Sequence, residues 1–344
     1  MEQKSSIWRD ARRWLPGVLI SLVALFILFQ FSNWNWAGLV ESWAAFQWPT
    51  LAALVGLTVF SLFIRAILWR TLLEERATIL QSFFIINIGY LLNNLFPLRA
   101  GEVGRAVFMG SATKLSPFHV LSTIVIERAF DLVMAAVLVL ATLPLALGQD
   151  WMRPAASVTL VLVVSMLGVL YLMARFQSRV HQIAAQLGKR WPLIQKLVVP
   201  QVDALLEGLQ ALVSFRRFLA VLGLVVANWV TWITIYYIGI LAIAPAAPFW
   251  WAMFADSVLA LGVAIPSAPA ALGVYEASMV AALTVLGVAY SPALAYAFLM
   301  HFIQFALTAL FGFWGLAREG KSLGNLWSEI RLAKTMNVVK DQHD

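Results

Sequence analysis

Long apolar runs are the feature that most constrains how this chain folds. Four runs are long and apolar enough to cross a bilayer as helices, at about 15–32, 51–72, 155–174 and 218–243. Two more runs, at about 120–147 and 291–317, are expected to cross as well. Only 12% of the residues are charged and 62% are hydrophobic, whereas soluble domains carry roughly 25% charged residues. The sequence therefore predicts an all-α integral membrane protein, with one polytopic membrane domain over 1–344.

Two further apolar regions are interrupted by helix-breaking residues. The region 79–96 runs into Pro97, and the region 250–288 contains Pro266, Pro269 and Gly273. Proline lacks the backbone donor that a helix interior needs, and glycine permits a sharp turn of the chain. We expect each region to form a broken helical hairpin rather than one straight span.

The distribution of basic residues tests whether these two regions cross the membrane. If each enters and leaves on the same side, 21 of the 24 Lys and Arg residues fall on one side and only Arg153 on the other. Such an excess marks the cytoplasmic side. The sequence thus predicts six full spans plus two re-entrant hairpins. It also places both termini in the cytoplasm, in a bacterial-type plasma (inner) membrane.

This topology divides the chain into two units of opposite orientation. The first repeat unit covers 51–147 and the inverted second unit covers 218–317. Inverted repeats with broken helices at corresponding positions are typical of transporters that bind substrate near the membrane midplane. Between them, 175–217 is either an amphipathic helix on the inner surface or a packed connector, and 318–344 is a basic cytoplasmic tail.

Charge, cysteine content and missing motifs limit the classes of function. The net charge of +7 is explained by short basic segments between apolar runs, so nucleic acid is not expected as a partner. The chain has no Cys, which excludes disulfides and thiol catalysis. It contains no phosphate-binding loop and no H-E-x-x-H sequence, so we expect no built-in ATP motor, no metal site and no cofactor.

The first candidate site follows the break at Pro97. Asn94 precedes the proline, and Gly101 permits the turn that follows it. After it come Arg99, Glu102 and Arg105 at spacings of three, which can share one helix face. Two guanidinium groups beside one carboxylate leave surplus positive charge and forked donors that suit a phosphate.

A second set of ionisable residues opens the span 120–147, and two carboxylates mark the second broken region. Glu127, Arg128 and Asp131 are either part of a polar site or a tie to the first cluster. In the second region Glu276 is expected in the first turn of a helix, and Asp256 lies either in the same cavity or near the outer interface. His301 and Arg65 stand alone in their spans and are attributed to packing or snorkelling.

At these residues the sequence resembles the flippase-like transmembrane family of the lysylphosphatidylglycerol synthase/flippase proteins. The resemblance covers roughly 15–318. It rests on three motifs: Asn94-x-x-Pro97-x-Arg99-Ala-Gly101-Glu102-x-x-Arg105, Glu127-Arg128-x-x-Asp131, and Ile265-Pro266-x-x-Pro269-x-x-x-Gly273-x-x-Glu276. The family pattern has glycines after the second proline of the last motif, where this chain has Ala270 and Ala271.

The resemblance implies a stand-alone member, without the soluble aminoacyl-transfer domain, that moves a lipid between leaflets. The substrate expected is a phospholipid, a glycolipid or a polyprenyl-linked lipid, with Arg99 and Arg105 on its phosphate and Glu276 as a titratable partner. Two alternatives remain open. One is a membrane transferase with Glu102 or Asp131 as base, and the other is a non-catalytic accessory subunit of an envelope-lipid pathway. A homo-oligomer is compatible with each.

Overall fold

A computed structural model describes most of the apolar core of the chain. The described residues are 19–28, 30, 36–96, 99–148, isolated positions between 158 and 173, 175–190, 214–265 and 267–320. Several predicted features lie outside them: Pro97, Pro266, most of the span 155–174, the stretch 191–213 and the tail after 320.

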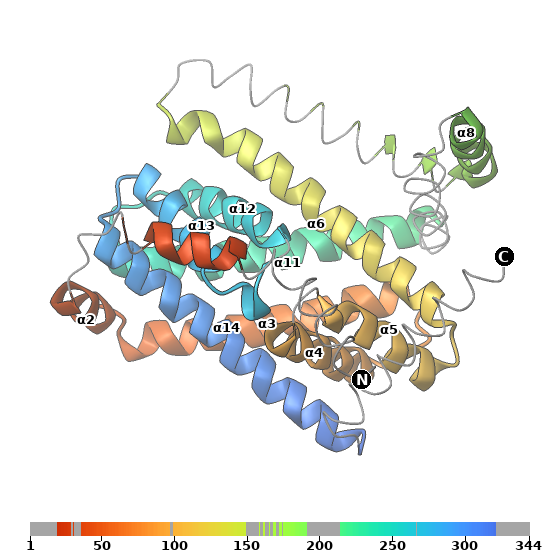
Figure 1. Cartoon of the computed structure of the whole chain (residues 1–344), viewed down its shortest axis with the longest axis horizontal. Helices are drawn as coiled ribbons and strands as arrows, with labels where there is room; N and C mark the ends of the chain where they lie inside the picture. The colour runs from red at the N-terminus through yellow and green to blue at the C-terminus, as the bar shows by residue number, and fades with distance from the viewer. Residues whose placement is uncertain are drawn as a thin grey trace, which may run out of the picture.

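All regular elements in the described ranges are helices (Figure 1). After a short helix at Leu19–Leu28, the labelled elements in chain order are α2 (Trp36–Ala44), α3 (Trp48–Leu72), α4 (Ile79–Leu95), α5 (Ala100–Thr113), α6 (Pro117–Ala146), α8 (Gln177–Arg190), α11 (Phe215–Ile243), α12 (Trp250–Ala264), the 3₁₀ turn η2 (Pro269–Ala271), α13 (Val274–Val285) and α14 (Tyr290–Arg318).

Four of these helices, α3, α6, α11 and α14, are long and apolar enough to cross a membrane. They correspond to four predicted spans, and each end lies within three residues of the predicted one. The described part of the first predicted span is a shorter apolar helix, Leu19–Leu28. An all-helical membrane architecture is thus confirmed.

The helices form two units with the same order of elements. Each unit has a long helix, a hairpin of two short helices and a second long helix: α3, α4–α5, α6 in one, and α11, α12–α13, α14 in the other. The packing between the units is reciprocal. Helix α3 packs on α11, while α4 packs on α14 and α12 packs on α6. Each hairpin is therefore held by the last long helix of the other unit, and Figure 1 shows the two hairpins toward opposite ends of the bundle.

Close backbone contact holds the first hairpin together. A Cβ atom on Gly101 of α5 would lie 1.8 Å from the carbonyl oxygen of Gly89 on α4, so the two helices meet at their glycines. The side chain of Asn93 reaches the same place, where its Oδ1 accepts a hydrogen bond from the backbone N–H of Gly101 at 2.8 Å. These contacts allow α5 to fold back along α4 directly after the break.

The two ends of the bundle differ in charge. Nη1 of Arg217, at the start of α11, lies 3.9 Å from Oε1 of Glu74, which follows α3. The start of α11 and the end of α3 therefore lie at the same end of the bundle. At the other end, Trp43 of α2 donates to the carbonyl of Ala295 near the start of α14 at 2.9 Å. The described loops at this second end, 36–47, 147–148, 244–249 and 286–289, contain no Lys or Arg. Among the described turns, those at the Arg217 end therefore carry the basic residues, such as Arg76 and Lys114, and those at the other end carry none.

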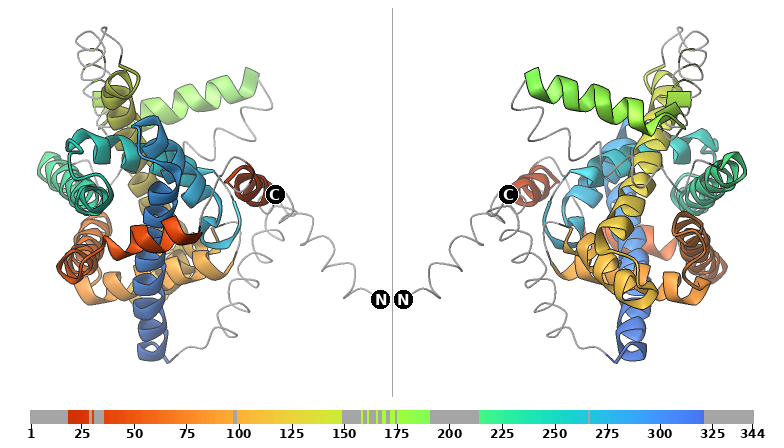
Figure 2. Two further views of the ribbon diagram at one scale, coloured as in Figure 1. Left: turned by 90° about the vertical axis from the view of Figure 1, so that its left-hand side faces the viewer. Right: turned by 90° about the vertical axis from the view of Figure 1, so that its right-hand side faces the viewer.

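Helix α8 is the described part of the predicted connector. It lies to one side of the long helices, where it is coloured bright green in Figure 2. Its apolar residue Ile183 is 58% exposed. An exposed apolar residue on a polar helix is compatible with the predicted surface helix.

Candidate functional site

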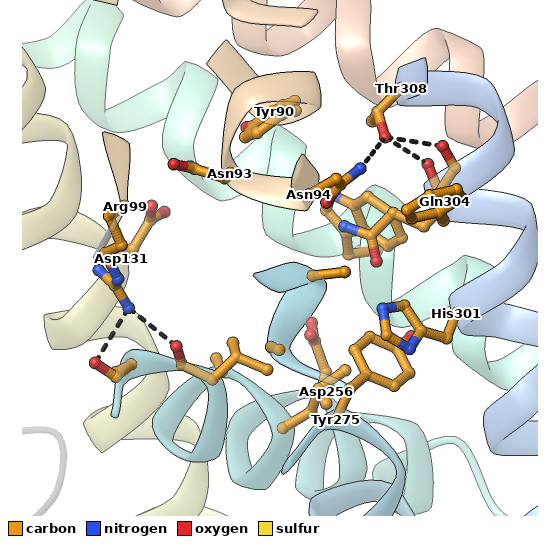
Figure 3. A pocket seen from close by; sticks show the side chains of 18 of the residues that line it. Tyr90, Asn93, Asn94, Arg99, Asp131, Asp256, Tyr275, His301, Gln304 and Thr308 are labelled. Carbon is orange, nitrogen blue, oxygen red and sulfur yellow. Dashed lines mark hydrogen bonds between the residues drawn. The ribbon is translucent and has the colours of Figure 1, made fainter. Parts of the chain in front are cut away.

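A cavity of about 410 Å³ lies where the two hairpins meet. Every long helix and both hairpins contribute to its wall (Figure 3). Its ionisable lining residues are Arg65, Arg99, Arg128, Asp131, Asp256, Tyr90, Tyr236, Tyr275 and His301. A polar cavity of this size inside an apolar helical bundle is a default candidate for a binding site.

Arg99 joins the tips of the two hairpins. Its Nη2 atom donates to the carbonyl oxygens of Val263 at 2.8 Å and Ala264 at 2.9 Å, at the end of α12 (Figure 3). The last carbonyls of a helix have no partner within the helix, and the C-terminal end of its dipole favours a cation. Arg99 thus caps one hairpin from the other, while 37% of its side chain stays exposed.

Both tips contain residues in the left-handed backbone region. Arg99 has φ 52° in the first hairpin, and Ala270 and Ala271 have φ 57° and 54° in the second. Such values cost roughly 1–2 kcal/mol for a residue with a Cβ atom. Glycine adopts these angles without that cost, so the backbone at Ala270 and Ala271 has a conformation that favours glycine. Strain of this kind concentrates at functional sites.

Four charged residues, of which Arg65 and Asp131 line the cavity, form a connected network of ion pairs. Glu127 lies between two arginines, with Arg105 Nη2 at 2.9 Å and Arg65 Nη2 at 2.8 Å. Arg65 also donates through Nη1 to Oδ1 of Asp131 at 3.0 Å. The guanidinium carbon of Arg105 lies 4.2 Å from the ring centroid of Trp69. These contacts connect α3, α5 and α6 at the cavity wall.

The predicted grouping of Arg99, Glu102 and Arg105 is therefore wrong in one member. Glu102 lies 3.7 Å from Arg99 and accepts from Nε of Arg128 at 3.2 Å. Arg105 points instead toward α6 and is 1% exposed, because α5 starts with the face of Gly101 and Arg105 packed against α4. Arg128 takes the place beside Glu102 that the spacing had given to Arg105, and it lines the cavity.

The second hairpin carries a matching contact. Glu276 lies in the first turn of α13, where its Oε2 accepts from the N–H of Gly273 at 2.7 Å. Its Oε1 lies 2.6 Å from Nδ1 of His301 on α14. Like Arg105 and Glu127 in the first unit, this pair ties the second helix of a hairpin to the following long helix.

The interpretation of Arg65 and His301 as isolated residues is also wrong. Arg65 pairs with two carboxylates of α6, and His301 pairs with Glu276. The ring of His301 also stacks on Tyr275, with centroids 4.2 Å apart. An arginine within an apolar span is energetically costly without a carboxylate partner. The position of Arg65 in such a span could therefore have indicated that it has one. No comparable signal points from His301 to Glu276.

Asp256 is buried in the cavity wall rather than placed at the outer interface. It is 7% exposed, and its Oδ2 atom accepts no hydrogen bond from any described residue. Its electrostatic neighbours include Tyr236 and Tyr275, whose hydroxyl oxygens lie 3.3 Å apart. Figure 3 shows Asp256 beside Tyr275 at the edge of the cavity.

The predicted site residues fall into two groups. Asn94, Arg99, Arg128 and Asp131 line the cavity, and Asn94 donates to Oγ1 of Thr308 at 3.2 Å. The other group does not line the cavity, and its members contact lining residues or one another: Glu102, Arg105, Glu127 and Glu276. Lining residues that the sequence did not single out include Tyr90, Asn93, Asn228, Trp229, Trp232 and Gln304. Among the described residues, no three His, Cys, Asp or Glu side chains are grouped to hold a metal ion.

Four spanning helices around a charged internal cavity define a multi-pass helical membrane protein. Residues 14–312 match the family described as the lysylphosphatidylglycerol synthase TM region, and the chain belongs to this family. The resemblance drawn from the three motifs is thereby confirmed. Searches of the curated proteins and of the solved structures found no match.

Proposed function

We propose that this protein moves the headgroup of a membrane lipid between leaflets through the cavity between the two hairpins. The observation that carries the proposal is the cavity itself, which places the guanidinium groups of Arg65, Arg99 and Arg128 inside an apolar bundle. The family supports a membrane domain associated with lipid metabolism or transport. The proposal is transport alone, with no chemical change of the lipid.

The charges in the cavity favour a phosphate-bearing headgroup. Arg65 is held by Asp131 and Glu127, so it contributes little free positive charge. The side chain of Arg128 is 32% exposed, and its Nε atom donates a hydrogen bond to Oε1 of Glu102. Arg99 and Arg128 both lie beside Glu102, and Arg128 Nη1 also lies 3.8 Å from Oδ2 of Asp131. The connected cluster contains four arginines and three carboxylates, which leaves net positive charge for a phosphate.

The size of the cavity suits a headgroup rather than a whole lipid. Its 410 Å³ is in the range of small-molecule sites, about 300–1,000 Å³. The acyl chains would remain in the surrounding bilayer. Aromatic side chains such as Trp229 and Trp232 form an apolar part of the cavity wall, next to the part lined by charged residues.

The proposal includes the membrane topology derived from the sequence. The Arg217 end of the bundle would face the cytoplasm of a bacterial-type inner membrane, since the basic residues of the described turns lie there. The hairpins α4–α5 and α12–α13 would then enter from opposite sides and meet at the cavity. Non-helical backbone at membrane depth is tolerated where it lines a polar cavity, as the two hairpin tips do.

Reconstituted vesicles test the function. The purified protein is placed in proteoliposomes with labelled phosphatidylglycerol, phosphatidylethanolamine, a glycolipid or a polyprenyl phosphate, and headgroup accessibility and lipid mass are followed together. We expect accessibility to change for a phosphate-bearing lipid while its mass stays constant. A changed lipid mass would instead identify a transferase. No change in either quantity for any lipid would contradict the proposal and favour an accessory subunit.

A further inference from the structure

We propose that Asp256 is a proton-binding site that couples proton uptake to occupancy of the cavity by an anionic headgroup. The inference rests on the proposed function and adds to it the ion with which transport is coupled. Uptake adds one proton from water to the carboxylate and leaves a neutral carboxyl group in the cavity wall.

The surroundings of Asp256 favour a neutral carboxyl group. The residue is buried, and its Oδ2 atom has no hydrogen-bond partner among the described residues. A buried carboxylate that is neither paired nor hydrogen-bonded costs far more free energy than its protonated, neutral form. Every other carboxylate of the cavity region that we have described, Asp131, Glu102, Glu127 and Glu276, has an arginine or histidine partner.

Among the described residues, no Lys, Arg or His side chain forms an ion pair with Asp256. The arginines that line the same cavity, Arg65, Arg99 and Arg128, have other partners. Helix α6 presents Asp131, which acts on Asp256 as a like charge. Helix α11 presents Tyr236, and α13 presents Tyr275 with Glu276 behind it. Helix α14 presents Tyr296 and also His301, whose Nδ1 is bound to Glu276. The titratable groups that these helices place around Asp256 are thus acidic or phenolic, apart from His301, which is bound to Glu276, and Arg128 of α6, which is paired with Glu102.

A proton fits this place better than a metal cation. Calcium and magnesium ions require several oxygen ligands, usually with carboxylates among them. The described residues contain no group of three His, Cys, Asp or Glu side chains that would supply such a set near Asp256. A single carboxyl oxygen is sufficient for a proton.

Coupling follows because Asp256 shares the cavity with Arg99 and Arg128. An anionic headgroup bound at these arginines repels an ionised Asp256 and does not repel a neutral one. Headgroup binding therefore favours proton uptake, and by linkage protonation favours headgroup binding by the same factor. Couplings of this kind are typically about 5- to 150-fold in affinity.

Infrared spectroscopy tests the proton site without any transport. In the purified protein near neutral pH, we expect a carboxyl C=O band that is lost in Asp256→Asn and kept in Glu41→Gln, a change at an exposed carboxylate. Soluble dihexanoyl phosphatidylglycerol should increase the band. Asn resembles a protonated Asp in shape, so the variant is expected to fold. A spectrum identical in wild type and Asp256→Asn would overturn the proposal.

Proteoliposomes with an imposed pH gradient test the coupling. Movement of labelled phosphatidylglycerol by the wild type should change at least about fivefold with the gradient, and movement by Asp256→Asn should not respond to it. Lipid movement by the wild type that ignores the gradient would overturn the proton site and leave the transport proposal intact. A requirement for Na⁺ in place of a pH gradient would also overturn it. If no lipid moves at all, transport fails, while the infrared band still decides whether Asp256 binds a proton.

Discussion

The ion pair between Arg105 and Glu127 offers the sharpest test of the structure. Both side chains are 1% exposed, and Arg105 Nη1 and Nη2 lie 3.2 Å and 2.9 Å from the two carboxylate oxygens. Removing one partner of a buried pair leaves an uncompensated charge and costs about 3–5 kcal/mol. We therefore expect Arg105→Met to lower the free energy of unfolding by this amount.

The network around the pair predicts how two substitutions combine. Glu127 is also ion-paired with Arg65 at 2.8 Å, so Glu127→Met removes the carboxylate partner of Arg105 and one of the two carboxylates beside Arg65. It should therefore cost at least as much as Arg105→Met. In the double variant neither charge of the pair is left buried, and Arg65 keeps Asp131. The double variant should therefore lose less than the sum of the two single losses, because apolar replacement of a whole buried pair is often close to neutral.

Unfolding in mild detergent, followed by tryptophan fluorescence, measures these free energies. The chain has 15 tryptophans, so this signal reports on unfolding of the whole bundle. Arg217→Met is the matched control, since Arg217 and Glu74 are partly exposed and 3.9 Å apart, and such pairs contribute about 0–1 kcal/mol. Single losses no larger than that of the control, or strictly additive losses in the double variant, would refute the buried pairing.

Three further predictions follow from the hairpin tips and the topology. Ala270→Gly should raise the unfolding temperature by relieving up to about 1 kcal/mol of strain in the left-handed backbone. The control Ala281→Gly, inside α13, should lower the unfolding temperature. A lower unfolding temperature in both variants would contradict strain at the hairpin tip. Arg99→Ala should speed amide hydrogen exchange at the end of α12, where two carbonyls lose their cap, and unchanged exchange would exclude this contact. Because the chain has no native Cys, Val40→Cys should react with an impermeant thiol reagent from outside and Ala112→Cys only from inside; outside labelling of the latter would contradict the first re-entrant hairpin.

The architecture could be predicted from the sequence because apolar length and charge act locally. Spans such as 51–72 and 218–243 are recognisable from their own residues, and their helices match closely. The break near Pro97 was visible for the same reason. The amide of Asn94 and the guanidinium of Arg99 could be placed near this break, and both line the cavity.

The pairing of charges could not be predicted in the same way, since partners come from helices far apart in the chain. The face that α5 presents depends on the left-handed turn at Arg99 and on the contact between Gly89 and Gly101. Spacing alone placed Arg105 beside Glu102, whereas the tertiary contacts place Arg128 there. Arg65, with two carboxylate partners, lay in an apolar run whose neighbours in space the sequence does not reveal.

The central claim is that guanidinium groups in the cavity hold a lipid phosphate during transfer between leaflets. Its most direct test is the rate of leaflet exchange of labelled phosphatidylglycerol by Arg128→Lys at matched protein levels in proteoliposomes, with Arg76→Lys in an exposed loop as control. Lysine keeps the charge and loses the forked geometry. A charge-assisted hydrogen bond contributes about 1.5–3 kcal/mol, so the account predicts at least about a tenfold loss of headgroup binding and slower exchange for Arg128→Lys. Exchange by Arg128→Lys at the rate of the wild type and of the control would contradict it.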